Sequence, residues 1–432
     1  MAIKTKDFVS YSDALKAFSS GLKEPEWMLE MRLSALEQID KLELPVIERL
    51  RYNRWPLWQV PNLTGAPAAK TVDPFEFVDD KADAARVIQT GNDTVIETLP
   101  ESLKEKGVIF TDLHTALREH PDLVKEAYMA KAIKPESNKI TAFHAAFMNS
   151  GLFLYVPKNL EIEEPLEAIF IQNSLVEDAF VKHVLIYADT HSNFSYVEKF
   201  LTKGDEKNAA NIAVEVITKP GAQVKFSAVD QLGENSTVYF NRKGYTHRDS
   251  SIDWALGVMN TGNVVCDFDT DLVGEGSATD LKAVGISSGR QTQVIDSNVV
   301  NYGNNTEGNI FQHGVILDRA TLTFNGIGHI VKGAKGADAQ QESRVLMLSD
   351  KARGDANPIL LIQENEVTAG HAASVGRVDP EEMYYLMSRG IEQSEAERLV
   401  IRGFLGKVIS AIPMKSMRDD LVQTIERKLT SR

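Results

Sequence analysis

Apolar and polar residues follow two different periods along the chain, and the change of period divides it into three stretches. In the middle stretch apolar residues alternate with polar ones, as in Ile212, Val214 and Val216, and glycine and asparagine mark the breaks. Alternation of this kind is typical of half-buried β-strands. On both sides of this stretch the apolar residues recur every three or four positions, as in helices. We therefore predict a mainly β protein with helical ends, made of a mainly helical region over 1–150, a β core over 151–368 and a C-terminal helical region over 369–432.

Bulky residues recur in the β core at an interval of 14 positions. The residues on this register are Phe226, Phe240, Trp254, Phe268, Ile310 and Phe324. Lys282 and Asp296 break the register, although Leu281 and Ile295 lie directly beside them. A fixed interval indicates stacked rungs. It fits a β-solenoid and a meandering sandwich equally well, so the interval alone does not decide between them.

The C-terminal region carries clear helix signals. Asp379 can cap a helix that has Pro380 at its first position and ends near Gly390. Ser394 and Glu397 form a second capping pattern, which predicts a helix running to the residue before Pro413. The last helix places Met417, Leu421, Ile425 and Leu429 on one narrow apolar stripe. Such a stripe packs either on the parent domain or on a partner, and the sequence leaves both open.

Composition excludes several classes of protein. The chain has 432 residues and a formal charge of −14, which argues against nucleic acid or an anionic membrane surface as a partner. No apolar run is long enough to span a membrane, and the start has no signal-peptide core. A single cysteine, Cys266, excludes an internal disulfide and fits a reducing cytoplasm. It also excludes an iron–sulfur cluster held by this chain's thiolates alone.

Enzyme motifs are nearly absent. The sequence contains no phosphate-binding loop of the Gly-x-x-x-x-Gly-Lys type and no His-Glu-x-x-His pattern. Gly285–Gly289 matches the nucleophile elbow around Ser287, but that motif requires a helix after the serine. The residues after Gly289 continue as a strand instead, so we interpret the match as a turn in the β core. We expect no catalytic residue in this chain.

Four residues near position 270 carry side chains that could bind a metal or react. Asp267, Asp269 and Asp271 alternate with apolar residues and should project from one strand face. Three carboxylates could hold a hard divalent cation, but they do not fit the EF-hand pattern, and a solvated face or a charged partner is the favoured explanation. Cys266 shares the opposite face with Val264 and Phe268, which favours a small buried residue over a reactive thiol.

The histidines are spread out, without metal-binding spacing. His313 and His329 lie within the β core, and we expect both to be structural. His371 differs because small residues flank it in the segment Gly370–Gly376, which we expect to be a loop at the end of the β core. An accessible neutral imidazole is a competent iron ligand, but the residues alone favour a structural role for His371.

The C-terminal landmarks resemble the SufB/SufD family of iron–sulfur cluster scaffolds, in its SufD form. They include Phe324–Gly328, Ala339–Gln341, Asn357–Pro358 and Gly370–Asp379, followed by Ser388–Gly390 and Gly403–Phe404. The resemblance covers most of the chain and implies a right-handed parallel β-helix core between helical ends. Many SufD proteins carry a cysteine two residues before the histidine, where this chain has Ala369. Any thiolate at that position must therefore come from a partner.

The resemblance also implies a function and partners. A SufD-like chain is a non-catalytic scaffold that pairs with a SufB-like scaffold through the β-helix and binds a SufC-like ATPase through its C-terminal helices. His371 would then be the cofactor- and metal-binding residue, beside a transient iron–sulfur cluster at the interface. The isolated chain is expected to hold no stable cluster, and it could form a homodimer.

Two alternatives belong to other classes. A β-helix carbohydrate-active enzyme would need clustered carboxylates or basic residues along a groove, and usually a secretion signal. A purely structural adaptor without cluster chemistry would share most of this sequence. The iron content of the complex with and without His371 separates the adaptor from the scaffold.

Overall fold

A computed structural model describes residues 8–65, 68–77, 84–412 and 415–430 of the chain. Nine α-helices and three short 3-10 helices lie in these ranges. The α-helices are α1 (Ser12–Leu22), α2 (Glu26–Gln38), α3 (Glu101–Lys104), α4 (Leu113–Glu119), α5 (Pro121–Ala127), α6 (Lys139–Phe147), α7 (Pro380–Ser388), α8 (Gln393–Ala411) and α9 (Lys415–Thr430). The 3-10 helices are η1 (Phe8–Tyr11), η2 (Pro74–Glu76) and η3 (Pro135–Ser137).

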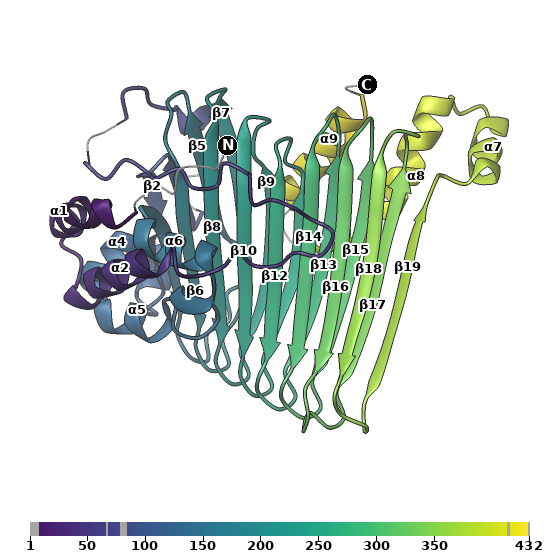
Figure 1. Cartoon of the computed structure of the whole chain (residues 1–432). Coiled ribbons are helices and arrows are strands. Elements are labelled where there is room, and N and C mark those ends of the chain that lie inside the picture. Colours follow the sequence, from purple (N-terminus) through teal and green to yellow (C-terminus); the bar gives the residue numbers. More distant parts are fainter. Residues whose placement is uncertain (1–7, 66–67, 78–83, 413–414, 431–432) are drawn as a thin grey trace.

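Between the helical ends the chain forms two facing sheets (Figure 1). Among the described residues, one sheet has ten strands in the order β19-β17-β15-β13-β11-β9-β7-β5-β1-β2, and the other has nine in the order β18-β16-β14-β12-β10-β8-β6-β4-β3. We call them sheet A and sheet B. The strands are β1 (Arg86–Thr90), β2 (Asp93–Thr98), β3 (Ile109–Asp112), β4 (Ser150–Val156), β5 (Leu166–Ser174), β6 (Phe180–Ala188), β7 (Asn193–Gly204), β8 (Asn208–Thr218), β9 (Gln223–Gln231), β10 (Ser236–Thr246), β11 (Ser251–Val258), β12 (Val264–Leu272), β13 (Ala278–Ser287), β14 (Thr292–Asn301), β15 (Glu307–Ile316), β16 (Thr321–Ile330), β17 (Asp338–Met347), β18 (Arg353–Ile362) and β19 (Thr368–Gly376).

From β4 onward, successive strands alternate between the sheets and every second strand pairs in parallel, so the chain winds into a β-solenoid of about eight turns. The expected parallel β-helix is therefore confirmed, and the sandwich is not formed. The N-terminal region is less helical than predicted, because it contributes β1, β2 and β3. Of these, β1 pairs in parallel with β5 and belongs to the solenoid.

In sheet A, stacking of equivalent side chains explains both the interval of the bulky residues and its break. Phe226 pairs with Trp254 in sheet A, one full turn of 28 residues later. The next turn is one residue shorter, so Trp254 pairs with Leu281 and not with Lys282. In sheet B, Phe240 pairs with Cys266 after 26 residues and Cys266 pairs with Ile295 after 29, so Cys266 and not Phe268 belongs to this buried column. Small differences in turn length thus move the buried column by one or two residues and preserve the apolar interior.

The N-terminal helices pack on the outer face of sheet B and are joined to it by a buried polar network. His144 of α6 lies 3.0 Å from the ring of His183 on β6, and His183 lies 3.1 Å from the carboxylate of Glu215 on β8. The same carboxylate accepts the backbone N–H groups of Met129 and Ile133, at 2.7 and 2.9 Å. Burial lowers the pKa of both histidines and raises that of Glu215 to about 8.

A segment of the N-terminal region, residues 44–58, continues across the outer face of sheet B and crosses its middle strands (Figure 1). We call it the strap. Apolar strap residues such as Ile47 and Leu57 pack on Val265 and Val294, and the Asn325 side chain donates to the Glu48 carbonyl at 3.2 Å. The strap therefore covers much of a face that would otherwise be open to solvent.

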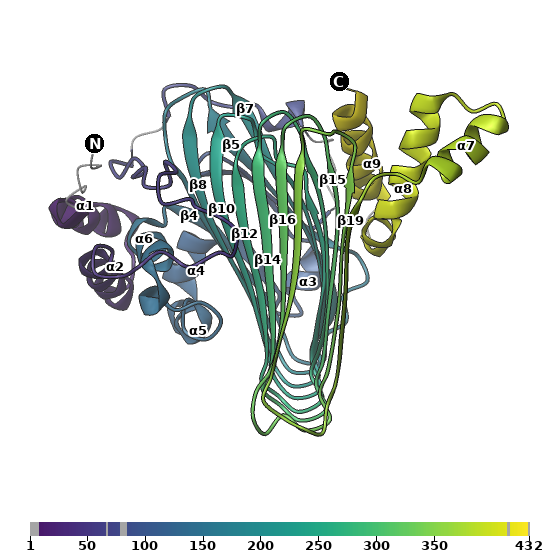
Figure 2. The same ribbon diagram turned by 45° about the vertical axis from the view of Figure 1, so that its right-hand side comes forward.

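The C-terminal helices α8 and α9 lie against the outer face of sheet A (Figure 2). Leu405 and Val408 of α8, with Leu421 and Ile425 of α9, are buried against strand residues such as Val284. The apolar stripe of the last helix therefore packs on the parent domain. Helix α7 begins as predicted, with Asp379 capping the Glu381 N–H and Pro380 in the first turn. The second capping pattern was wrong, because α8 begins at Gln393 and its N-cap is Glu392.

An ion triad is enclosed within the solenoid between the sheets. The Arg242 guanidinium donates to Glu198 at 2.7 Å and forms two hydrogen bonds of 2.7 Å with Asp230, and all three side chains are fully buried. The guanidinium also lies 4.5 Å from the ring centre of Phe240. Burial raises the pKa of Glu198 to about 7, while Arg242 opposes this rise. Arg242 neutralises one of the two carboxylates, so the ionised triad carries one net negative charge. Removing Arg242 would leave two buried negative charges without a cation.

We predict that Arg242→Met lowers the free energy of unfolding by ~3–5 kcal/mol, because two acids then remain buried without their partner. Urea unfolding followed by circular dichroism measures the change. The matched control is Arg248→Met, since the ion pair of Arg248 with Asp249 is exposed and should matter by less than ~1 kcal/mol. Equal midpoints for the two variants would contradict the prediction.

Candidate functional site

His371 lies in strand β19, and the expected loop at this position is wrong. The β structure continues to Gly376, and β19 pairs in parallel with β17 in the register His371 to Gln341 and Ala369 to Ala339. It is the last strand of sheet A and its other edge has no neighbour among the described strands. His371 is exposed, since no further turn covers it.

The register places His371 at the end of a column of side chains inside the solenoid. Following the strand pairs of sheet A, the column contains Leu166, Tyr196, Phe226, Trp254, Leu281, Ile310, Gln341 and His371. The members from Leu166 to Ile310 are buried apolar or aromatic residues. The last two are polar and stand where the interior meets solvent.

Other interior positions near the same end are also polar. The Gln312 amide donates to the Ile295 carbonyl at 3.2 Å and to the Ser297 hydroxyl at 3.0 Å, and Ser343 donates to Gln312 at 2.9 Å. The Gln341 amide donates to the Ile359 carbonyl at 3.0 Å, but its buried oxygen Oε1 has no hydrogen-bond partner. The last turns therefore hold oriented polar groups next to His371, where the earlier turns hold mainly apolar ones.

This end of the solenoid can supply an imidazole but not a complete metal site. Within the described ranges, no group of three or more His, Cys, Asp or Glu side chains is arranged to hold a metal ion. A metal or cluster at His371 would thus need additional ligands from outside the described residues. Iron–sulfur clusters take most of their ligands as thiolates.

Cys266 lies on β12 in the apolar core, with no exposed surface. In sheet B, strands β14 and β16 separate it from the last strand, β18. Burial raises the pKa of its thiol, which disfavours the reactive thiolate. Its position agrees with the interpretation of a small core residue.

The three aspartates on β12 project from the outer face, opposite Cys266, as predicted. The prediction of a solvated face is wrong for Asp267. Its carboxylate lies near the strap and accepts a hydrogen bond from the Tyr239 hydroxyl at 2.9 Å. Burial and the neighbouring Asp269 raise the pKa of Asp267. Asp269 forms an ion pair with Lys243 at 3.1 Å.

Ser287 ends strand β13, and the chain passes through a short turn into strand β14 at Thr292. No helix follows the serine, so the geometry of a nucleophile elbow is not formed.

His313 connects the solenoid to the C-terminal helices. Its Nδ1 lies 2.9 Å from the Phe404 carbonyl and its Nε2 lies 2.7 Å from the Glu342 carboxylate. The imidazole also stacks on the Phe404 ring, with 4.6 Å between ring centres. Both ring nitrogens face acceptors, so His313 holds α8 against sheet A. This agrees with the structural interpretation of His313, whose link to Phe404 could not be seen from the sequence.

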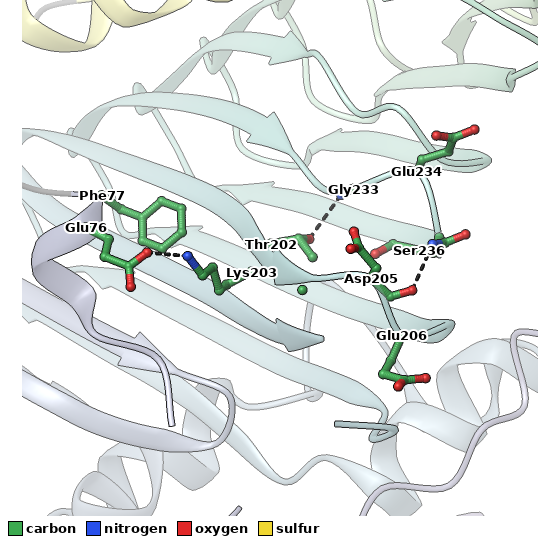
Figure 3. Close-up of a pocket in the computed structure, with 11 residues that line it drawn as sticks. Glu76, Phe77, Thr202, Lys203, Asp205, Glu206, Gly233, Glu234 and Ser236 are labelled. Carbon is green, nitrogen blue, oxygen red and sulfur yellow. Dashed lines mark hydrogen bonds and ion pairs between the residues drawn. The ribbon is translucent and has the colours of Figure 1, made fainter. Parts of the chain in front are cut away.

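Two surface hollows were not foreseen from the sequence. The first, with a volume of about 390 Å³, lies at the ends of β7 and β10 (Figure 3). Lys203 pairs with Glu76 at its rim, and Asp205, Glu206 and Glu234 make it acidic. The second, of about 450 Å³, lies beside the N-terminal helices. Neither contains His371.

Comparison with known proteins identifies the family to which this chain belongs. The family model described as the SufBD core domain of SUF-system FeS cluster assembly matches residues 170–404, and the SufBD N-terminal region matches residues 82–168. The chain therefore belongs to the SufBD family of iron–sulfur cluster assembly proteins.

Individual relatives extend this result over the whole chain. The iron–sulfur cluster assembly protein SufD of Bacillus subtilis is 45% identical over 99% of this chain and 100% of its own length. A SufBD family protein of Staphylococcus haemolyticus is 27% identical over 93% of this chain and 89% of its own length. No helix in the described ranges is long and apolar enough to cross a membrane.

We predict that His313→Ala loosens the C-terminal helices without unfolding the solenoid. The variant loses the contacts of both ring nitrogens, with the Phe404 carbonyl and the Glu342 carboxylate, and a ring stack, together worth ~2–4 kcal/mol. Hydrogen exchange should accelerate in α8 and α9 while the middle strands keep their protection. Arg344→Ala is the matched control, because Arg344 contacts the same Glu342 from an exposed position. Unchanged exchange in α8 after loss of His313 would show that this contact does not hold the helix.

Proposed function

We propose that this chain is a non-catalytic scaffold of iron–sulfur cluster assembly that completes its site with a partner. The single observation that carries the proposal is the position of His371 on the last, uncovered strand of the solenoid. The family membership supports the choice of cargo. The nascent cluster is transient and passes on, so it is a substrate of the assembly and not a resident cofactor. We place this activity in the cytoplasm, where a lone free thiol such as Cys266 stays reduced.

The partner for the open end is a second scaffold of the SufB type. Strand β19 offers unpaired backbone groups along one edge, and β18 does the same in sheet B. Such edges pair readily with another chain. Exposed apolar residues, including Leu361, Ile362 and Val375, lie on these two strands and would be covered by the pairing. The same edges would support a homodimer of the isolated chain.

In this arrangement His371 is the contribution of this chain to the cluster site. The position two residues before it is Ala369, so thiolates must come from the partner. The unpartnered oxygen of Gln341 lies on the neighbouring strand of the same column and is available to orient a group that enters the interface. A neutral imidazole then binds iron through a ring nitrogen.

We propose that the ATPase of the system binds the exposed part of the C-terminal helices. The apolar stripe of the last helix is buried against sheet A, and Leu405 and Val408 of α8 also pack there. The large apolar side chains that remain exposed are Tyr384, Tyr385 and Met387 on α7 and Leu399 on α8. Their position gives a partner an apolar anchor beside the open end of the solenoid.

Two other functions are less well supported. A carbohydrate-active enzyme would need a row of catalytic carboxylates, whereas Asp267, Asp269 and Asp271 lie on the face that the strap and Lys243 partly occupy. A purely structural adaptor would share the pairing edges but would not depend on the His371 imidazole.

We predict that His371→Ala leaves folding and complex formation intact but lowers the iron bound per complex by at least about fivefold, because the cluster loses a ligand. Iron and acid-labile sulfide are measured on the complex co-expressed with its SufB-like and SufC-like partners. Ser374→Ala, in the same exposed strand, is the control. Full iron content in the His371 variant would favour the adaptor, and loss of the complex would assign the residue to the interface alone.

We predict that the double change Tyr384→Glu and Tyr385→Glu weakens binding of the SufC-like ATPase by at least about tenfold, since two exposed anchors are replaced by charges. Titration calorimetry with the purified ATPase gives the affinity. Tyr302→Glu is the matched control, because it also replaces an exposed tyrosine but lies on the solenoid, away from α7. Tyr302 is 47% exposed and Tyr384 is 75% exposed. Equal affinities for wild type and the double variant would exclude α7 from the docking surface.

A further inference from the structure

A row of polar side chains crosses the outer face of sheet B and ends at the open end of the solenoid. The strand register aligns Asp296 of β14, Asn325 of β16 and Asn357 of β18. The Asn325 amide donates to the Asp296 carboxylate at 2.7 Å, and the Asn357 amide donates to the Asn325 oxygen at 3.0 Å. We call these three residues the polar row. In-register side-chain amides can form such ladders, because neighbouring strands lie only about 4.8 Å apart.

The strap fixes the direction of the hydrogen bonds in the polar row. The Nδ2 of Asn325 also donates to the Glu48 carbonyl at 3.2 Å, and a backbone carbonyl can only accept. The nitrogen of Asn325 therefore serves the strap and Asp296, and its oxygen is left for Asn357. Asn357 must direct its own Nδ2 towards that oxygen. Each strand of the row thus donates to the strand before it.

The last member of the row has an acceptor that is not used. Asn357 lies on β18, which ends sheet B among the described strands. Because its Nδ2 is turned towards β16, its Oδ1, at the opposite corner of the carboxamide, lies on the side of the free edge. Within the described ranges no donor reaches this oxygen, and Asn357 is half-buried whereas Asn325 is fully buried. A further strand with a donor in this register would continue the row.

The surroundings of Asn357 favour a neutral donor. Ile359 and Leu361 follow it on the same face of β18, and Leu361 is 46% exposed. On the other side Asp355 already pairs with Arg353 at 3.0 Å. A strand that covers this face would bury the two apolar side chains and exclude water from the Asn357 oxygen. A charged donor is costly to desolvate there, so the amide of an Asn or Gln side chain fits better.

The free edge of sheet A offers no equivalent group. The corresponding register on its outer face contains Asp280, Asn309 and Gln340 and ends at Gly370, which has no side chain. The Asn309 amide donates to Asp280 at 2.8 Å, but this row does not reach the last strand. The two edges of the open end therefore differ, and a partner can be aligned by a side chain only on the edge of sheet B that carries Asn357.

We propose that Asn357 sets the register of the partner scaffold by accepting, through Oδ1, a hydrogen bond from an Asn or Gln side chain on the partner strand that continues sheet B. The inference rests on the proposed function, since it requires a second scaffold at the open end. A slip of one residue turns the donor to the other face of the strand. A slip of two residues places it opposite Asp355, which is paired already, or opposite Ile359, which is apolar. The hydrogen bond thus selects one register.

Titration calorimetry of the full-length chain with its SufB-like scaffold tests the assignment. Asn357→Ala should weaken binding by at least about fivefold, because the donor of the partner is then buried without an acceptor. Asn309→Ala is the matched control. It removes a side-chain amide that also bonds an aspartate on the neighbouring strand, but in the row that stops short of the edge, so the affinity should not change. Urea unfolding verifies that both variants fold.

The possible results separate this inference from the proposed function. If the wild-type chain does not bind the scaffold, the proposed function fails and the inference fails with it. If the wild-type chain binds and Asn357→Ala binds equally well, only the inference is overturned. It is also overturned if Asn357→Ala weakens only the self-association of the isolated chain in sedimentation, which would assign the amide to a second copy.

A structure of the complex gives a readout that does not depend on the variants. The amide nitrogen of an Asn or Gln side chain of the partner at hydrogen-bond distance from the Asn357 Oδ1 would support the proposal. Water alone, or an apolar side chain, at that position would overturn it.

Discussion

The last strand of a parallel stack has backbone N–H and C=O groups that no further strand can pair. This constraint shapes the rest of the molecule. Each inner strand of the solenoid forms hydrogen bonds with the strand on either side of it in its sheet, so every turn depends on the next. At the N-terminal end the two sheets are terminated by antiparallel strands, β2 on sheet A and β3 on sheet B, and helices cover the adjoining face. At the other end β18 and β19 remain half-exposed or exposed along their length. The two ends are therefore unequal, because the terminal strands of one end are antiparallel additions beside helices and those of the other end are solenoid strands without a further turn.

The side chains inside the solenoid also differ between its middle turns and its open end. The middle turns enclose aromatic residues and an ion triad whose charges are held by one another. Towards the open end the interior positions become Gln312, Ser343 and Gln341, and the column ends at His371. Polar groups at these positions cost little once water or a partner can reach them. The same end carries α7 with its exposed tyrosines, so the surfaces proposed for two partners adjoin one another.

Much of this architecture could be predicted from the sequence, because strand alternation and helix caps are local signals. The cap at Asp379 and the placement of Cys266 opposite Asp267 are examples. The sequence interval could not distinguish a solenoid from a sandwich, because both bury the same alternating face, and the family resemblance made that choice. The small residues around His371 weaken the strand signal and predict a loop, whereas pairing with β17 keeps this segment extended. The strap over Asp267, the Phe404 contact of His313 and the hollow beside the N-terminal helices depend on residues far apart in the chain, which no local pattern reveals.

We propose that the open end of the solenoid is an interface that closes when a partner scaffold adds to it. Hydrogen exchange of the backbone amides measures this directly, with the chain alone at a concentration where it is monomeric and then in complex with its SufB-like partner. We expect a large gain in protection confined to β18, β19 and the adjoining turns, with no change in β5 to β9. A complex that forms without added protection at β18 and β19 would contradict it.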